Sequence, residues 1–470
     1  MSVYSVLVFL FFFLPPFDTD LGWYIRLGEE FFTSGTIPTA NDLTYYLAGY
    51  RVGNPYPLYS ILVAFVYRYT GLWGLAILNS VVMTLCYWIF QKIVGKLKLL
   101  SFVSFAAISL LAWTVFSLGI RAQLFSFLFF LLVLCIFKKA YSKIKYLFFL
   151  PLVFFFWANL HGAFVLGLII VAVFWGDVLF RRKYKLAIYL GAVYLVSVLI
   201  VAVNAYGFSL YGRAVEHFQA PLATLIAEWV PPNFPTRSAI VVLLVVTLVL
   251  AVARRSISPY LPLLIIFSFL YFQARRNASF YWLSLILVYA DYYWGKLLKI
   301  EKSRVAGSLK LPVMVVSLFL LVIGQMPVTI KAISNHNSFC NSNPATLPCE
   351  VVTYLKQNPL TVKNIYTAYE WGGYLEWQLP EYKYFVDGRM PAWPTPEGKS
   401  PYTMYLEIIQ AKPGYQQMLE KYGTEALLIG SGTFLDLELK KGENDNWQEV
   451  YRDEVAVLYI GIFGGVGGSI

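Results

Sequence analysis

Charged residues are scarce in this sequence, and their scarcity excludes an ordinary soluble protein. Only 13% of the 470 residues are Asp, Glu, Lys or Arg, while 59% are hydrophobic. A soluble globular protein has about a quarter charged residues. Aromatic residues make up 18% of the chain, a proportion that suits helices in contact with lipid tails and headgroups. The composition therefore predicts an integral membrane protein.

Cysteine is also rare, with 4 residues, and no group of Cys and His residues has the spacing of a zinc site. Cys86 and Cys135 fall in apolar runs, where we expect them to be inert. Cys340 and Cys349 lie close together in a polar segment and would close a short loop in an oxidising compartment. We therefore expect a disulfide between them. The alternative is two free thiols in an organism that does not oxidise proteins outside the membrane.

The N-terminus lacks the marks of a cleaved signal peptide. No basic residue precedes its apolar run, residues 2–17, and no small-residue cleavage site follows it, because the run ends in Pro15-Pro16-Phe17. We expect an uncleaved first helix.

Long apolar runs dominate the first 330 residues and predict about eleven transmembrane helices, several of them short for a bilayer about 30 Å thick. They lie near residues 2–17, 71–91, 99–118, 122–137, 146–158, 162–180, 186–203, 239–252, 257–273, 277–294 and 311–329. Lys and Arg clusters follow the even-numbered runs and mark cytoplasmic loops, so we expect a cytoplasmic N-terminus and an outer C-terminal segment. Topology thus explains the net charge of +11, and nucleic acid is not an expected partner.

The expected organisation is an α-helical polytopic membrane protein with a soluble α/β domain outside the membrane. The transmembrane domain would span residues 1–330, with a first outer loop at 18–70, and the extracytoplasmic domain residues 331–470. The pattern of the last segment predicts strands near 362–367, 383–386 and 426–429, helices near 370–379 and 413–422, and a hairpin near 447–459.

Two carboxylates, Asp18 and Asp20, open the first outer loop where the first helix should leave the bilayer. A carboxylate at the membrane surface can take a proton from an incoming hydroxyl, and the pair can hold a divalent cation such as Mg²⁺ or Mn²⁺. Trp23 and Tyr24 would follow one helical turn later and stack on a sugar ring, while Arg26 would keep Asp20 ionised. The alternative is a helix N-cap at the start of a solvated loop.

Isolated arginines at the outer ends of apolar runs need an explanation, because the positive-inside rule disfavours them there. Arg26, Arg121, Arg275 and Arg276 are of this kind. A guanidinium grips a phosphate or diphosphate through paired hydrogen bonds, so we expect these residues to bind an anionic substrate group. The alternatives are snorkelling side chains and structural ion pairs.

Two further outer segments contain candidate substrate contacts. His161 lies in a short polar interruption at 159–162, which is either a ligand contact or a tight turn between two short helices. Glu228 lies in the outer loop 204–238, just before Trp229 and two prolines. Its role is either contact with substrate or packing.

The order of these features resembles the plan of the GT-C glycosyltransferases, membrane enzymes that use polyprenyl-phosphate-linked sugars. Motifs over nearly the whole chain resemble, more closely, a large group of GT-C-like bacterial and archaeal membrane proteins. These motifs lie at 18–46, 121–126, 159–162, 204–207, 275–277, 370–375 and 386–389. The resemblance implies a multi-helix membrane fold with an outer first loop and an outer soluble domain.

A more distant similarity is to the catalytic subunit of oligosaccharyltransferase. There an aspartate precedes an arginine by six residues in the first loop, as Asp20 precedes Arg26 here. The Trp-Trp-Asp-Tyr-Gly motif of that family would correspond to residues 368–372, where Glu370 and Trp371 are candidate substrate contacts. Glu replaces Asp and Ala the first Trp, so peptide recognition is not implied. The resemblance implies a catalytic acid at Asp20, with Asp18 as its rival, and leaves metal use open.

These resemblances imply a glycosyltransferase that moves a sugar from a polyprenyl-phosphate or diphosphate donor to an acceptor on the outer face, with inversion at the anomeric carbon. The acceptor, whether glycan, lipid or protein, stays open. Two other classes remain: a lipid-linked oligosaccharide polymerase or ligase, including an oligosaccharyltransferase-like enzyme, and a non-catalytic or transport protein that retains the fold. Transporters carry ionisable groups near the bilayer midplane, whereas the polar groups here cluster at the outer surface, which favours an enzyme.

Overall fold

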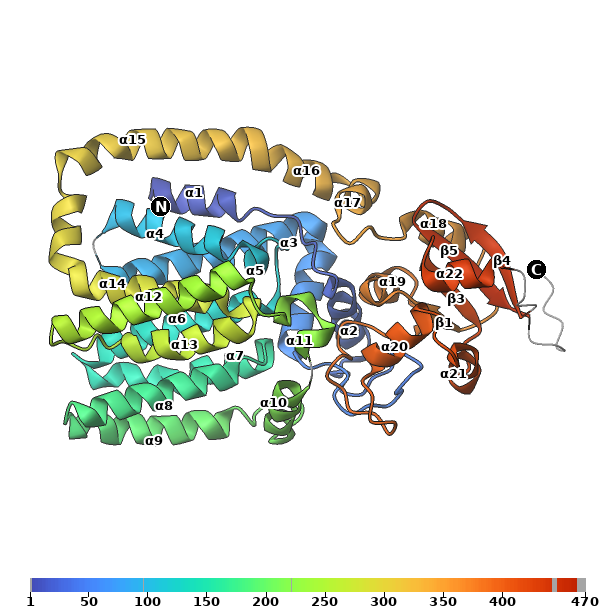
Figure 1. Ribbon diagram of the computed structural model, residues 1–470, viewed down its shortest axis with the longest axis horizontal. Helices are drawn as coiled ribbons and strands as arrows, with labels where there is room; N and C mark the ends of the chain where they lie inside the picture. The colour runs from blue at the N-terminus through green and yellow to red at the C-terminus, as the bar shows by residue number, and fades with distance from the viewer. Residues whose placement is uncertain (1, 96, 221, 442–445, 463–470) are drawn as a thin grey trace. The chain divides into compact units, whose positions relative to one another are not determined.

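The computed structural model describes residues 2–95, 97–220, 222–441 and 446–462, which are mostly helical (Figure 1). The chain forms two compact units, each assembled from separate segments. The first, called the helical unit below, consists of Met1–Pro16, Gly74–Ala214 and Pro221–Thr329. The second, called the mixed unit, consists of Phe17–Trp73, Val215–Ala220 and Ile330–Ile470.

The helices of the helical unit follow the apolar runs of the sequence. Those that lie within it are α1 (Val3–Phe11), α4 (Lys98–Leu111), α5 (Trp113–Phe116), α6 (Ala122–Ala140), α7 (Leu150–Leu160), α8 (Phe164–Phe180), α9 (Tyr184–Ile200), α11 (Leu222–Leu225), α12 (Phe234–Ala253), α13 (Leu261–Gln273), α14 (Ala278–Glu301) and α15 (Arg304–Phe319). Three more have residues in both units: α3 (Pro57–Val94), α10 (Ser209–Gln219) and α16 (Met326–Ser334).

Among the described residues, 4 helical segments are long and apolar enough to cross a membrane: Pro57–Val94, Ala122–Ala140, Ala227–Ala253 and Arg304–Ser334. Several shorter apolar helices accompany them, including α8, α9 and α13. These are the helices of a multi-pass membrane protein. The expected count of about eleven spans exceeds what length and composition support in the described part of the chain, because many of the runs form helices shorter than a bilayer is thick.

Burial separates the interior helix from those with exposed apolar faces. The apolar window of α6 is 72% buried, against 17% for the segment that contains α12 and 11% for the one that contains α15 and α16. Helices α6 to α9 lie side by side (Figure 1). The stacked and edge-on rings of Phe130, Phe267 and Phe280 join α6 to α13 and α14. The exposed apolar faces of α12 and α15 are surfaces that lipid would cover.

The first apolar run is helical over a shorter stretch than expected. Helix α1 ends at Phe11, ahead of Pro15 and Pro16, so residues 12–17 are not part of it. Its last carbonyls are bonded by side chains from other helices of the same unit. Asn79 Nδ2 donates to the carbonyl of Phe12 at 2.6 Å, and Gln325 Nε2 to that of Phe11 at 2.6 Å. These bonds satisfy groups that the early helix end would leave without partners.

The mixed unit contains a five-stranded sheet in the order β2-β1-β3-β5-β4. Its strands are β1 (Asn364–Thr367), β2 (Lys383–Tyr384), β3 (Ala426–Gly430), β4 (Trp447–Arg452) and β5 (Ala456–Gly461). Strands β2, β1 and β3 are parallel, whereas β5 and β4 are antiparallel to their neighbours. The expected strands and terminal hairpin are therefore confirmed.

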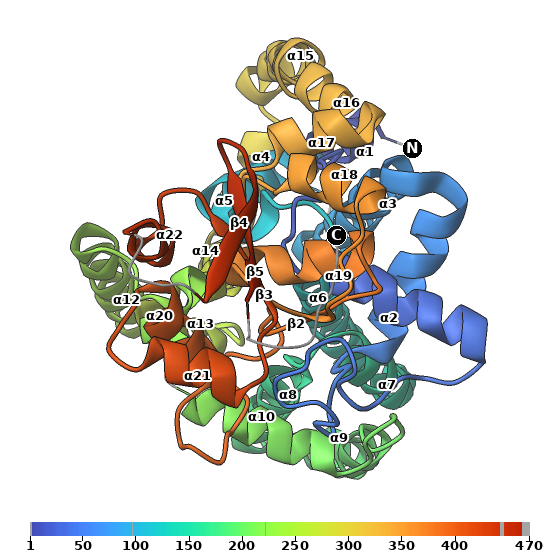
Figure 2. The same ribbon diagram turned by 90° about the vertical axis from the view of Figure 1, so that its right-hand side faces the viewer.

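Helices cover both faces of this sheet (Figure 2). On one face lie α18 (Cys349–Gln357) and α19 (Gly372–Gln378). On the other lie α20 (Pro401–Ile409), α21 (Tyr415–Lys421) and α22 (Phe434–Leu439). Alternate strand residues divide between the faces, because side chains of a strand alternate. Tyr366, Leu427 and Val457 share a buried cluster with residues of α20 to α22.

The first outer loop expected at 18–70 is more ordered than a loop and belongs to the mixed unit. It contains helix α2 (Leu21–Ser34), and α3 already begins at Pro57, ahead of the apolar run expected at 71–91. The backbone of Leu43 and Tyr45 bonds to that of Tyr384, so this segment extends the sheet beyond β2. The sequence signal was weak because neither α2 nor this edge segment is uniformly apolar.

The disulfide expected between Cys340 and Cys349 is confirmed, with the two Cα atoms 6.2 Å apart. It joins α17 (His336–Ser342) to the start of α18. Tyr374 packs beside it, and the Tyr374 hydroxyl lies 2.9 Å from His336 Nε2. Cys86 and Cys135 are free and buried, as expected of apolar positions.

Candidate functional site

Asp20 lies at the start of α2 without capping it. Its backbone is helical, with φ −80° and ψ −12°, and its side chain makes no capping hydrogen bond to the helix. Asp20 is half-buried, and Asp18 is 7% exposed. The N-cap alternative therefore does not account for Asp20, because an N-cap aspartate accepts a hydrogen bond from the first turn.

The Asp20 carboxylate lies directly against the backbone of Gly388. A Cβ added at Gly388 would lie 1.7 Å from Asp20 Oδ1 and 2.8 Å from its Cγ. Any residue larger than glycine would displace the carboxylate. The same kind of approach joins α2 to α19, where a Cβ at Gly22 would lie 1.8 Å from the carbonyl oxygen of Gly373. Three glycines thus bring the first loop into contact with the C-terminal segment.

Gly388 sits between two buried charged residues that hold one another. The Asp387 carboxylate accepts hydrogen bonds from the Arg389 backbone N–H at 2.8 Å and from Arg389 Nε at 3.0 Å. The remaining guanidinium nitrogens donate to the first loop, Nη1 to the carbonyl of Gly53 at 2.7 Å and Nη2 to Asn41 Oδ1 at 3.0 Å. The Arg389 side chain is 0% exposed. Arg389 therefore ties the turn after β2 to the first loop.

A third acid, Glu376 on α19, completes this buried group. One of its oxygens lies 3.8 Å from Arg389 Nη2, and its side chain is 1% exposed. Burial, reinforced by the charge of Asp387, raises the pKa of Glu376 well above its usual range despite the nearby Arg389. Neither of its oxygens accepts a hydrogen bond from a described residue. We call Glu376, Asp387 and Arg389 the buried triad.

The aromatic neighbours of Asp20 face inward. Trp23 is 2% exposed and Tyr24 4%, so neither ring is open to a ligand, and stacking on a sugar stays a prediction. Trp23 instead covers Arg389, whose guanidinium carbon lies 5.7 Å from the ring centre. Arg26 is half-buried on α2. Arg389 is a cation that acts on Asp20, and it was not among the candidate residues predicted from the sequence.

A cavity of about 360 Å³ opens where strands β1 and β3 end. Its walls include the rings of Trp371 and Tyr405, each 6% exposed, and the exposed carboxylates of Glu370 and Glu454 lie at its edge. The carboxyl ends of parallel strands are a common place for ligands. Aromatic walls with carboxylates at the rim suit a polyhydroxyl or cationic ligand, so the structure brings the candidates Glu370 and Trp371 to one cavity.

In the helical unit, two of the candidate arginines converge on Glu228. Arg121 Nη1 lies 3.1 Å and Arg276 Nη1 3.6 Å from its carboxylate oxygens. The Arg276 guanidinium also lies 4.2 Å from the centre of the Trp229 ring. Arg275 is exposed, and its Nε donates a weak hydrogen bond to the carbonyl of Pro231 at 3.4 Å. The ion-pair alternative applies to Arg121 and Arg276, but two guanidinium groups share one carboxylate, so this cluster keeps a net positive charge.

Sequence comparisons give no match, either to models of protein families or to curated proteins. Solved structures do match. The fold resembles that of the archaeal oligosaccharyltransferase AglB. The Archaeoglobus fulgidus enzyme in complex with an inhibitory peptide and a dolichol-phosphate aligns with a TM-score of 0.55 and 10% identity over 91% of this chain and 69% of that chain.

Two further structures of the oligosaccharyltransferase from that organism align in the same way. The form tethered with an acceptor peptide containing the NVT sequon gives a TM-score of 0.56 and 11% identity over 98% of this chain and 74% of that one. The complex with Zn and sulfate gives 0.52 and 10% over 91% and 68%. At this identity the likeness establishes an AglB-like fold, and activity has to be argued from the residues.

His161 is buried and hydrogen-bonded within the helical unit. It is 7% exposed, its Nδ1 lies 2.6 Å from Ser126 Oγ, and Trp157 Nε1 donates to the same hydroxyl at 2.7 Å. These contacts tie α6 to the end of α7. They favour the tight-turn alternative over a ligand contact.

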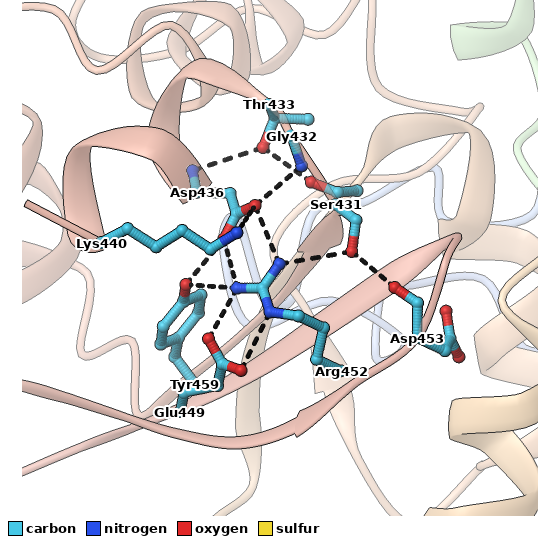
Figure 3. Close-up of polar contacts among 10 residues, drawn as sticks. Ser431, Gly432, Thr433, Asp436, Lys440, Glu449, Arg452, Asp453 and Tyr459 are labelled. Carbon is cyan, nitrogen blue, oxygen red and sulfur yellow. Dashed lines mark hydrogen bonds and ion pairs between the residues drawn. The ribbon is translucent and has the colours of Figure 1, made fainter.

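A second charged network in the mixed unit shows what a purely structural cluster looks like (Figure 3). Asp436 accepts from Arg452 Nη2 at 2.7 Å, from the Tyr459 hydroxyl at 2.7 Å and from the Gly432 N–H at 2.7 Å. Burial alone would raise the pKa of Asp436, but these hydrogen bonds outweigh it and hold that pKa below its usual range. Asp436 thus has close hydrogen-bond partners, whereas Glu376 lies 3.8 Å from its ion-pair partner Arg389.

A metal site built by protein alone is not evident in the described part of the chain. The one group there of three or more close His, Cys, Asp or Glu ligands is His336 with Cys340 and Cys349, and the disulfide occupies both sulfurs. Asp18 and Asp20 offer two carboxylates. That is enough for Mg²⁺ only if water or substrate phosphate supplies the other ligands, as is common for this cation.

Proposed function

We propose that this protein is a glycosyltransferase that moves a sugar from a polyprenyl-phosphate or diphosphate donor to an acceptor on the outer face of the membrane. The observation that carries the proposal is the half-buried Asp20 carboxylate, held against Gly388 beside the buried triad. A carboxylate so enclosed serves no helix cap. The AglB-like fold supports the same reaction class, since AglB is an oligosaccharyltransferase whose structure contains a dolichol-phosphate.

In the proposed reaction Asp20 removes the proton from the acceptor nucleophile as that atom attacks the anomeric carbon. A new bond forms on the face opposite the lipid phosphate, and the bond from the anomeric carbon to the phosphate oxygen breaks. The lipid phosphate leaves with that electron pair, so the configuration inverts. Arg121 and Arg276, with Arg275 beside them, bind the negative charge of the phosphate.

Asp18 and Asp20 are the residues that would hold a divalent cation, which would supply further charge neutralisation. Asp18 is the rival for the role of base. The proposed topology has a cytoplasmic N-terminus and the mixed unit outside, in keeping with basic loops such as the one at 138–145.

Replacing Arg276 or Arg121 with Gln should weaken binding of a polyprenyl phosphate about 10- to 100-fold. A hydrogen bond to a charged group contributes about 1.5–3 kcal/mol, which corresponds to that range. Binding is measured by competition of the lipid against a photoreactive polyprenyl phosphate on the full-length protein in detergent micelles.

Glu228→Gln is the matched control, because it changes the same cluster in the opposite sense. It removes the carboxylate that competes for the guanidinium groups, so donor binding should be kept or strengthened. If all three variants bind the lipid as the wild type does, the cluster is a structural ion pair and the donor site lies elsewhere.

The cavity lined by Trp371 and Tyr405 is the proposed site of acceptor recognition. Glu370→Gln should raise the acceptor KM about 10-fold, the effect of losing one charge-assisted hydrogen bond, and leave donor affinity unchanged. The exposed Glu381 lies outside the residues that line this cavity, so Glu381→Gln is a control. An unchanged acceptor KM in Glu370→Gln would remove the cavity from the acceptor path.

A further inference from the structure

The buried triad has no role in the proposed chemistry, yet its position ties it to the proposed base. Asp387 and Arg389 flank Gly388, on which the Asp20 carboxylate rests. Any shift of this turn therefore moves the surface against which Asp20 is held. A Cβ at this position would overlap the carboxylate, so any residue larger than glycine would displace the Asp20 side chain.

Arg389 fixes this turn from two sides. Within the turn it is bound to Asp387 through both its backbone N–H and its guanidinium group. In the first loop Arg389 donates hydrogen bonds to the Gly53 carbonyl and to the Asn41 side chain. Asn41 is itself held by a hydrogen bond to Thr44 Oγ1 at 2.6 Å. Trp23 and Trp393 cover the guanidinium group at 5.7 and 5.5 Å. The planar guanidinium group of arginine donates to several fixed acceptors at once, and the ammonium group of lysine does not reproduce that geometry.

Several acidic groups and one cation lie near Asp20. The titratable and charged groups near Asp20 are Asp18 and Tyr24 from its own segment, Tyr369 before α19, Glu376 on α19, and Asp387 and Arg389 in the turn. Arg389 is the cation of this set. Asp20 and Asp387 thus lie in the field of one buried guanidinium group.

We propose that Arg389 is a positioning residue for the Asp20 base, acting through the Gly388 turn. The inference rests on the proposed glycosyl transfer and adds a residue that touches neither donor nor acceptor. The guanidinium group of Arg389 fixes the turn, and the turn sets where the Asp20 carboxylate lies.

The positioning role is tested by Arg389→Lys and Arg389→Gln in a transfer assay. Lys keeps the charge and loses the planar guanidinium group, so kcat should fall about 10-fold or more, and Gln should lower kcat by at least the same factor. Donor Kd, measured by lipid binding, and the acceptor KM should stay the same in both variants. An unchanged kcat in both variants, or a loss of donor binding that accounts for the loss of rate, overturns the positioning role.

Two further variants separate positioning from loss of fold. Gly388→Ala leaves Arg389 in place and displaces the Asp20 carboxylate, so it should lower kcat by at least the same factor, whereas Gly295→Ala meets open space and should not. Arg452→Lys disrupts the other arginine network of the mixed unit, where Arg452 holds the buried Asp436 (Figure 3). It should lower the Tm and leave kcat unchanged. If Gly388→Ala retains full kcat, or Arg452→Lys lowers kcat as Arg389→Lys does, Arg389 is structural only.

These outcomes are distinct from failure of the proposed function. If Asp20→Asn retains activity, the base assignment fails and the Arg389 inference fails with it. If Asp20→Asn is inactive but the Arg389 and Gly388 variants are as active as the wild type, only the positioning role fails.

Discussion

Asp20→Asn should lower the turnover of sugar transfer by about two to four orders of magnitude, the usual contribution of a general base. The substitution keeps the size of the side chain and removes its ability to take a proton. The carboxamide fits against Gly388 as the carboxylate does, because both are planar and of equal volume. Release of the lipid phosphate from a polyprenyl-phosphate-linked sugar, followed with purified protein in liposomes, measures the effect.

Asp18→Asn is the matched comparison for this result. Asp18 is 7% exposed and lies two residues before Asp20, so a rearrangement at the start of α2 would bring it to the substrate. Donor Kd and Tm should be close to the wild-type values in Asp20→Asn, which separates loss of chemistry from loss of binding or fold. If Asp18→Asn is the inactive variant, the base is Asp18. If both variants turn over normally, the proposed mechanism is wrong for this protein.

The sequence predicted the fold better than it predicted the site, and the reason lies in the range of the contacts. Apolar runs and strand patterns are local signals, so the helices of the helical unit and strands β1, β3, β4 and β5 follow from them. The packing of α2 against α19 depends on Gly22 and Gly373, which are far apart in sequence and meet only in the fold. No periodicity in either segment predicts that contact.

The candidate residues show the same division. Asp20 was found from its position after an apolar run, and Arg121 and Arg276 from their position against the positive-inside rule. That both arginines share Glu228 was not foreseen, because the loop 204–238 carries no pattern that pairs it with α6. Arg389 and Glu376 were missed as functional candidates. The tripeptide Asp387-Gly388-Arg389 was the available signal, since a glycine between two opposite charges indicates a turn that must approach something closely.

The buried triad makes the stability of the mixed unit depend on pH in a direction opposite to that of most acids. The folded state holds the proton of Glu376 more tightly than the unfolded state does, because burial and Asp387 raise its pKa. The stabilisation from this group is fully present below the unfolded pKa of about 4.3 and is lost as pH rises towards the folded pKa. Each pH unit in that window costs about 1.4 kcal/mol.

Glu376→Gln should therefore become more stable than the wild type as pH rises. Gln keeps the volume and the neutral state of the buried carboxyl group and has no proton to lose. The free energy of unfolding of Glu376→Gln should rise relative to the wild type between pH 5 and 8, for as long as the pH stays below the folded pKa of Glu376, and the Tm should rise with it. Thermal unfolding of the full-length protein in detergent at a series of pH values measures the difference.

Glu449→Gln is a control of opposite sign in the same unit. The hydrogen bond from Arg452 lowers the pKa of Glu449, so its contribution is present above the unfolded pKa and is lost as pH falls through the folded pKa. Glu449→Gln should therefore be less stable than the wild type at neutral pH, with a difference that shrinks towards acid pH. A constant Tm difference between Glu376→Gln and the wild type from pH 5 to 8 would mean that Glu376 is ionised in the folded protein. The triad would then carry two negative charges against one guanidinium group.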